Sequence, residues 1–87
     1  MTSRARRSFW EAFGKLPQDV QKIAREKFKL WRQDPFHPSL HFKHLRADVW
    51  SVRVNQQCRA LGLRQGDTIA WFWIGPHSTY DRLANTP

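Results

Sequence analysis

Hydrophobic positions in residues 17–33 repeat with the period of an α-helix. The apolar stripe contains Val20, Ala24, Phe28 and Trp31. The opposite side carries four cations, Lys22, Arg25, Lys29 and Arg32. This amphipathic pattern predicts a helix whose apolar stripe packs against a core. Pro17 suits the first turn of the helix, and Pro35 requires it to end shortly before.

A shorter helix is predicted before it, at residues 8–13. Ser8 and Glu11 match the capping box, in which the hydroxyl and the carboxylate satisfy free backbone N–H groups at the helix start. Gly14 follows at a position where a helix end favours a residue with positive φ. Residues 1–7 are polar and basic and are interpreted as a loose arm or a short strand. The first half of the chain is therefore expected to be a helical hairpin.

Beyond Pro35 and Pro38 the pattern changes to an alternation of apolar and polar residues, which is typical of β-strands. Within 49–55, for example, Trp50, Val52 and Val54 alternate with polar residues. Tight connections are predicted at Ala47-Asp48, near Gln56-Gln57 and at residues 65–67. Together these signals predict four strands, at residues 40–46, 49–55, 58–64 and 68–74.

The last predicted strand is apolar on both faces, as expected of a central strand. Gly75-Pro76 is expected to break it, and residues 77–84 are expected to form a short helix. Residues 1–87 would then form one α+β domain, an N-terminal helical hairpin packed on an antiparallel β-meander with a short C-terminal helix.

The charge of the chain narrows the range of functions. Fifteen Lys and Arg oppose seven Asp and Glu, which gives a formal net charge of +8 over 87 residues. A field of this strength attracts polyanions, so nucleic acid or an acidic partner segment is expected. The simpler interpretation, that the charge only maintains solubility, stays open at this point. A membrane is not an expected partner, because no apolar run is long enough to span one.

Cysteine usage and the N-terminus indicate the compartment. Cys58 is the single cysteine, which leaves no internal disulfide and no cysteine-based zinc cluster. Arg4, Arg6 and Arg7 are not followed by an apolar stretch, so they do not form a secretory signal. A cytoplasmic protein is expected.

Metal chemistry is not indicated. The acidic residues are scattered, so no carboxylate cluster suited to a two-metal nuclease is visible. His37, His41 and His44 would align on a helix, but Pro35 and Pro38 forbid that helix, and on a strand His41 and His44 would point to opposite faces. We expect neither a metal nor another cofactor.

A metal-free polar set remains. Lys43, Arg53 and Arg59 fall on adjacent predicted strands, and His77 and Tyr80 follow the last one. RNA carries its own nucleophile, the 2′-OH, so cleavage requires a base, cations on the phosphate and an acid for the departing oxygen. Histidine titrates near neutrality and the arginine fork suits a phosphate. These residues alone do not exclude solvated strand cations or a simple helix cap at residues 77–80.

Three segments carry a resemblance to a known family: Trp50-Ser51-Val52-Arg53-Val54, Cys58-Arg59-Ala60-Leu61 and Trp73-Ile74-Gly75-Pro76-His77-Ser78-Thr79-Tyr80. They resemble toxins of the RelE/ParE superfamily of type II toxin–antitoxin systems, over about residues 8–84 and most clearly over 39–84. The spacing from Trp50-Ser51 to Arg59 is similar to that of the YoeB branch. The Gly-Pro-His ending at His77 is similar to that of YafQ-type toxins.

The resemblance implies roles for individual residues. Arg59 would steady the scissile phosphate, His77 would act as acid or base, and Tyr80 would orient the substrate. In relatives, a Glu or Lys that precedes the pair corresponding to Leu45-Arg46 is the candidate general base. Lys43 would be its counterpart here, with His44 as a substitute. Further candidates for phosphate binding are Arg53, Arg46 and His44. Relatives usually begin with a strand, whereas this chain is expected to be helical from Ser8, which leaves one edge of the sheet undefined.

The function that the resemblance implies is a ribosome-dependent mRNA endoribonuclease, or mRNA interferase, that cleaves without metal and inhibits translation. Its partners would be a cognate antitoxin, the ribosome and mRNA. One alternative is a ParE-like toxin that inhibits DNA gyrase and is not a nuclease. Another is an inactive basic RNA-binding module.

Overall fold

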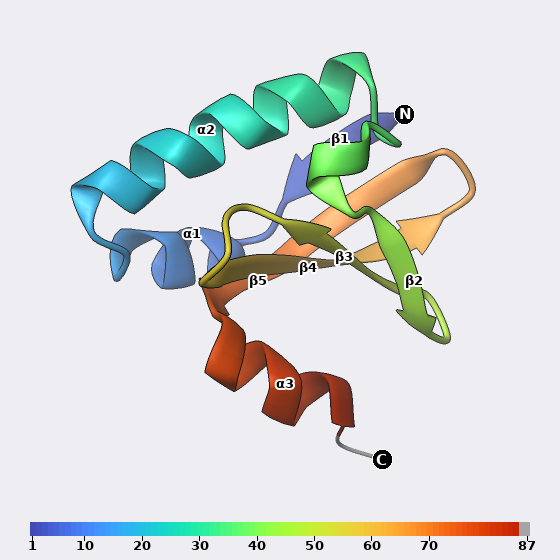
Figure 1. The fold of residues 1–87 in the computed structure, drawn as a ribbon. Coiled ribbons are helices and arrows are strands. Elements are labelled where there is room, and N and C mark those ends of the chain that lie inside the picture. Colours follow the sequence, from blue (N-terminus) through green and yellow to red (C-terminus); the bar gives the residue numbers. More distant parts are fainter. Residues whose placement is uncertain (86–87) are drawn as a thin grey trace.

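The computed structural model describes residues 1–85 and has the expected α+β architecture (Figure 1). The helices are α1 (Arg7–Gly14), α2 (Gln18–Gln33), the short 3-10 helix η1 (Pro38–Leu40) and α3 (His77–Asn85). The strands are β1 (Thr2–Ala5), β2 (Lys43–Arg46), β3 (Val49–Arg53), β4 (Cys58–Gln65) and β5 (Thr68–Pro76). No helix in the described part of the chain is long and apolar enough to cross a membrane.

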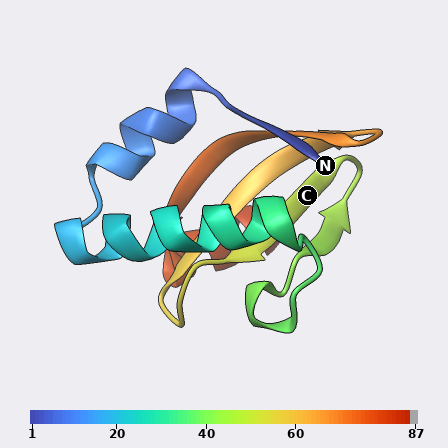
Figure 2. The same ribbon diagram turned by 90° about the horizontal axis from the view of Figure 1, so that it is seen from above.

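The strands form one sheet in the order β1-β5-β4-β3-β2. Strands β2 to β5 make the predicted antiparallel meander. The N-terminal residues form a strand that pairs in parallel with β5, from Thr2 opposite Thr68 to Ala5 opposite Trp71. The undefined sheet edge is thus occupied by β1, and the sheet is mixed. Helices α1 and α2 cover one face of it, and α3 lies beyond the end of β5, away from α2 (Figures 1 and 2).

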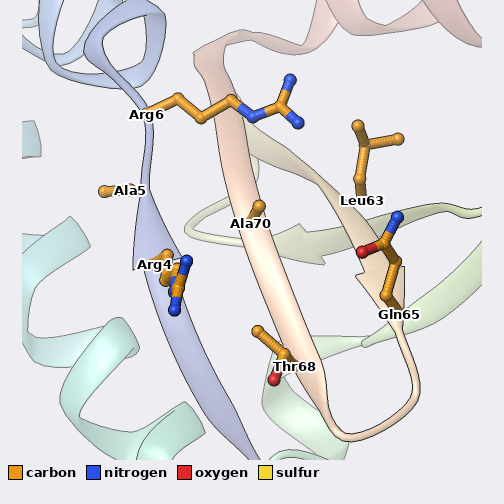
Figure 3. Close-up of a pocket in the computed structure, with 7 residues that line it drawn as sticks. All are labelled: Arg4, Ala5, Arg6, Leu63, Gln65, Thr68 and Ala70. Carbon is orange, nitrogen blue, oxygen red and sulfur yellow. The ribbon is translucent and has the colours of Figure 1, made fainter.

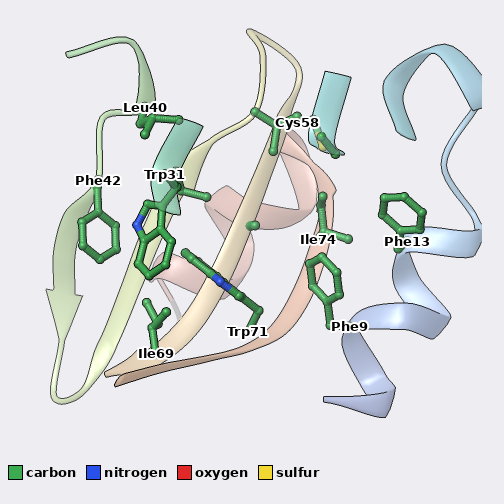
Figure 4. Close-up of a cluster of buried hydrophobic side chains, with 13 residues drawn as sticks. Phe9, Phe13, Trp31, Leu40, Phe42, Cys58, Ile69, Trp71 and Ile74 are labelled. Atoms are coloured by element: carbon green, nitrogen blue, oxygen red, sulfur yellow. The ribbon is translucent and has the colours of Figure 1, made fainter. Parts of the chain in front are cut away.

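An aromatic core fixes α2 on the sheet (Figure 4). Trp31 of α2 is fully buried, and its ring meets that of Trp71 edge to face, with 5.5 Å between the centroids. The ring of Phe28 meets Trp71 at 5.1 Å, and that of Phe42 meets Trp31 at 5.6 Å. Each such pair contributes about 0.5–1.5 kcal/mol beyond the burial of its area. The predicted apolar stripe of α2 therefore faces the sheet as expected.

The predicted caps of the first helix are wrong. Helix α1 begins at Arg7 with Arg6 as N-cap and without a side-chain cap. The Ser8 hydroxyl instead donates to the carbonyl oxygen of Phe72 at 2.7 Å, and Glu11 forms an ion pair with Arg7. A contact with β5 thus replaces the local capping bond. Gly14 is the last residue of α1 and does not have positive φ; among the described glycines only Gly66 does.

Several strand boundaries also differ from the prediction, by one residue at the end of β4 and by more elsewhere. The strand expected at 40–46 begins at Lys43, because the chain first forms η1 and then turns through His41, whose φ is 45°. The strand expected at 49–55 ends at Arg53, where the turn to β4 starts. Gly75-Pro76 does not break β5, since both residues still lie opposite β4 and α3 follows directly.

Gly62 gives the core room for its indole rings, which leads to a prediction. A Cβ atom at Gly62 would lie 2.8 Å from Cγ1 of Ile69 and 2.9 Å from Cε3 of Trp71, both of which belong to buried side chains. We expect Gly62→Ala to lower the free energy of unfolding by about 1–3 kcal/mol, as overpacking of a core does.

Gly14→Ala is the matched control, since a Cβ atom there meets nothing within 4 Å. It should raise the free energy of unfolding by up to about 1 kcal/mol, because alanine favours a helix over glycine. Urea unfolding at equilibrium measures both changes. Equal stability of Gly62→Ala and the parent would contradict the packing described here.

Candidate active site

The centre of the candidate site is a pair of arginines. Arg53 on β3 and Arg59 on β4 are directly opposite in the antiparallel register, so their side chains leave the same face of the sheet. Hydrogen bonds close the intervening turn, among them those from Val54 N to Cys58 O at 3.0 Å and from Gln57 N to the Asn55 side chain at 2.8 Å. Like charges directly opposite destabilise a sheet. An anion bound between the two arginines would therefore stabilise the sheet by reducing their mutual repulsion.

Hydrogen bonds to the backbone hold the Arg59 guanidinium. Its Nη1 donates to the carbonyl oxygens of Asn55 and Cys58, at 2.5 and 3.1 Å. Burial lowers the pKa of Arg59, and the positive charge of Arg53 lowers it further, while Tyr80, Cys58 and Asp81 partly oppose these effects. The group nevertheless stays cationic at neutral pH, because arginine begins from a very high pKa. The same interactions indicate that Tyr80 and Asp81 of α3 lie close to Arg59.

Helix α3 brings a histidine and a tyrosine to the same end of the sheet. The backbone N–H of His77 donates to the carbonyl oxygen of Gln57 at 2.7 Å, which ties the first residue of α3 to the turn between β3 and β4. The rings of His77 and Tyr80 are 5.6 Å apart between centroids. Tyr80 is buried, whereas the His77 side chain is 43 % exposed. Four of the predicted residues, Arg53, Arg59, His77 and Tyr80, are thus brought together.

A carboxylate orients His77. Nδ1 of His77 lies 3.0 Å from Oδ2 of Asp81, one helical turn further along α3. With its proton on Nδ1, the ring donates to Asp81 and leaves the lone pair of Nε2 free for proton transfer, an arrangement also found in other acid–base sites. The pair follows from the spacing of four residues on a helix, a signal present in the sequence that the prediction did not use.

Lys43 lies on the same face of the sheet but outside this group. It is exposed on the edge strand β2, opposite Ser51 of β3. Two strand spacings, at least about 10 Å, separate its backbone from that of Arg59. Arg46 is further away, since it pairs with Val49 at the opposite end of β3 from Arg53.

His44 does not reach the candidate site. It is opposite Trp50, and its ring lies against that indole on the helix-covered face, with centroids 5.6 Å apart. Nε2 of His44 donates to the carbonyl oxygen of Ala47 at 2.6 Å, which supports the turn where Ala47 has a φ of 45°. The structure thus gives His44 a contact within the β2–β3 hairpin.

His41 is a neighbour of the site that the prediction missed. Because it ends η1 in a left-handed conformation, its ring turns toward β3, and Nε2 lies 3.5 Å from Nη1 of Arg53. Cys58, by contrast, is buried beside Arg59, and burial raises the pKa of its thiol to about 11. A thiol of that pKa is protonated at neutral pH and is a poor nucleophile. Within residues 1–85, no three metal-ligating side chains gather where they could hold an ion.

Comparison with known proteins places the chain in a family. The model of the ParE-like toxin domain matches residues 18–82. The chain therefore belongs to the ParE-like toxin family. Comparison of the sequence with curated proteins finds no match.

Solved structures share the fold. The RelBE2 toxin–antitoxin complex from Mycobacterium tuberculosis matches with a TM-score of 0.71 and 21% identity, covering 86% of this chain and 95% of that one. The RelB–RelE complex from Methanococcus jannaschii matches with a TM-score of 0.73 and 16% identity, over 91% and 96%. The YoeB/ParE toxin from Agrobacterium tumefaciens matches with a TM-score of 0.67 and 15% identity, over 88% and 99%. The fold is that of RelE/ParE toxins, as the three sequence segments suggested.

The His77–Asp81 contact predicts which tautomer His77 adopts. We expect neutral His77 to carry its proton on Nδ1, because Asp81 accepts from that atom. Asp81→Asn should shift the ring toward the Nε2–H form that free imidazole side chains favour. Long-range ¹H–¹⁵N NMR spectra distinguish the two tautomers. His37, whose Nδ1 accepts from the backbone N–H of Ser39, is the internal control and should not change. An Nε2–H tautomer at His77 in the parent protein would contradict the assignment.

Proposed function

We propose that this protein is a metal-independent endoribonuclease that cuts mRNA on the ribosome and that a cognate antitoxin silences. The observation that carries the proposal is the Arg53–Arg59 pair beside His77 and Tyr80 at one end of the sheet. Two guanidinium groups would hold the scissile phosphate as negative charge develops on it. The histidine beside them supplies a ring nitrogen that can accept or donate a proton.

The reaction requires no nucleophile from the protein. The 2′-oxygen of the RNA attacks the adjacent phosphorus as it loses its proton, and the bond to the 5′-oxygen of the next nucleotide breaks as that oxygen gains a proton. The products are a 2′,3′-cyclic phosphate and a 5′-OH. His77, with Nε2 free, takes or gives one of these protons. Lys43, two strands away, suits an electrostatic contact with the RNA backbone better than proton transfer.

Dependence on the ribosome fits the openness of the site. His77 is 43 % exposed and Asp81 53 %, so the groups lie on a surface that does not by itself enclose a flexible substrate. Positioning of reactants accounts for a large part of many enzymatic rate enhancements. We infer that the ribosome supplies this positioning by presenting the message in a fixed conformation.

An antitoxin partner is supported by charge and by the structural neighbours. The chain carries a net charge of +8, which favours a partner with an acidic segment. Structures of the same fold from Mycobacterium tuberculosis and Methanococcus jannaschii are toxin–antitoxin complexes. A bound antitoxin would also stabilise this small domain by mass action.

A second candidate function follows from the name of the matching family. The family model describes a ParE-like toxin domain, and the alternative inferred from the sequence is a toxin that inhibits DNA gyrase without cutting RNA. That activity would not depend on His77. The same set of variants therefore separates the two functions.

The test is primer extension on a defined message in a purified translation system. We expect the parent protein to produce cuts on translated mRNA. Arg59→Gln and His77→Gln should each reduce the cleavage rate by about 10²- to 10³-fold, the usual loss when one transition-state contact is removed. Lys29→Gln is the control, because it removes one exposed charge from α2, far from the site in sequence and on the helix-covered side. Intact message with the parent, together with inhibition of gyrase supercoiling, would favour the second function.

A further inference from the structure

A polar hollow lies at the opposite end of the sheet from His77, at the β1 edge (Figure 3). It has a volume of about 330 Å³. Arg4 and Arg6 enter it from the N-terminal strand and the residue after it, and Gln65 and Thr68 enter it from either side of the β4–β5 turn. The apolar side chains of Ala5, Leu63 and Ala70 complete the lining.

The hollow opens on the same face of the sheet as the arginine pair. Arg4 is opposite Ala70 on β5, and Ala70 is opposite Leu63 on β4. Alternate residues of a strand share a face, so Leu63 and Gln65 are on the side of Arg59. Gln65 is six positions beyond Arg59 on β4, which corresponds to about 20 Å at the rise of an extended strand. One single-stranded polyanion of a few residues could contact both places.

The charge of the hollow is positive and unbalanced. Its lining contains two guanidinium groups and no carboxylate. Within residues 1–85, the guanidinium groups of Arg4 and Arg6 have neither a hydrogen-bond nor an ion-pair partner, whereas the neighbouring Arg7 is paired with Glu11 at 3.3 Å. Asp67, in the adjacent turn, faces the amino group of Met1 at 3.9 Å. The hollow thus offers two forked donors, an amide and a hydroxyl to an anion.

We propose that this hollow binds a phosphate group of the RNA backbone, away from the cut. The inference rests on the proposed function and extends it to a second subsite. No aromatic side chain lines the hollow, so stacking of bases is not available there, and the contact would be independent of sequence. An acidic protein segment is less well suited, because protein partners depend on large side chains that fill apolar pockets, and the apolar lining of the hollow is limited to Ala5, Leu63 and Ala70.

The experiment measures binding without cleavage. Fluorescence anisotropy is recorded with 2′-O-methyl RNA of about two and about twelve nucleotides, because only the longer one can span the distance between the arginine pair and the hollow. We expect Arg4→Gln/Arg6→Gln to weaken binding of the longer oligonucleotide by at least about tenfold, the effect of losing charge-assisted hydrogen bonds. The log–log slope of binding against salt concentration should fall by about 0.7, for one lost phosphate contact. Binding of the shorter oligonucleotide, at the arginine pair, should change little.

The control removes the same charge elsewhere. The double variant Arg7→Gln/Lys29→Gln also loses two positive charges. Arg7 is ion-paired on α1, and Lys29 is exposed on α2. An equal loss of affinity in this control would overturn the proposal in favour of a general electrostatic field. Gln65→Glu, which places a carboxylate in the hollow, should reproduce the weaker binding of the longer RNA, and urea unfolding verifies that each variant is folded.

Other outcomes are equally decisive. Unchanged binding of the longer RNA by Arg4→Gln/Arg6→Gln overturns the subsite. Poly-glutamate is measured as a second polyanion, and a variant that binds it more weakly but binds RNA normally also overturns the subsite. Because 2′-O-methyl RNA cannot be cut, the result does not depend on nuclease activity. If the parent protein fails to cut mRNA in translation yet shows the predicted difference between variants, the proposed function fails and the RNA subsite stands.

Discussion

The register of the β3–β4 hairpin places two positively charged residues directly opposite each other. Arg53 and Arg59 are directly opposite, an arrangement that costs stability in the absence of a counter-ion. The β3–β4 turn enforces it, and the carbonyl oxygens of Asn55 and Cys58 fix one of the two guanidinium groups. An anion placed between them would remove the repulsion. The features around the pair, from the turn to the start of α3, can be understood as the support for such an anion.

The rest of the fold maintains that register. Helix α2 is anchored by Trp31 against Trp71, and the missing side chain at Gly62 leaves room for the Trp71 ring. The indole N–H groups of Trp31 and Trp71 are buried without a hydrogen-bond partner within the described residues, and each such group costs about 1–3 kcal/mol. The edge-to-face aromatic contacts must offset this cost. A small domain with such a core gains from a partner that binds only its folded form.

Sequence patterns predicted those elements in which local signals agree with the tertiary structure. The stripe on α2, the alternation along β3 and the start of α3 at His77 are of this kind. Where a distant contact replaces a local one, the prediction failed. The Ser8 hydroxyl bonds to β5 and not to its own helix. For the N-terminal residues the sequence left a loose arm and a short strand open, and pairing with β5 selects the strand at Thr2–Ala5.

The candidate site was predicted in part for the same reasons. The sequence brought four residues to one end of the sheet because it located the β3–β4 turn and the start of α3 correctly. These residues are Arg53, Arg59, His77 and Tyr80. Lys43 lies two strand spacings from Arg59 on the edge strand β2, and the His44 ring lies against Trp50 on the helix-covered face. His41 joins the site through a left-handed residue after η1. The position of its ring depends on the backbone conformation after η1. Pro35 and Pro38 predict that the helix ends in this region, but not this conformation.

The most direct measurement is cleavage of a message that carries a single 2′-deoxynucleotide at the position of the cut, presented by translating ribosomes. If the arginine pair holds the phosphate while the RNA's own hydroxyl attacks it, the modified position will resist cleavage, and the unmodified message will end in a 2′,3′-cyclic phosphate. Cleavage at the deoxynucleotide at the normal rate would mean that water or a protein group is the nucleophile, and would contradict the mechanism proposed for this site.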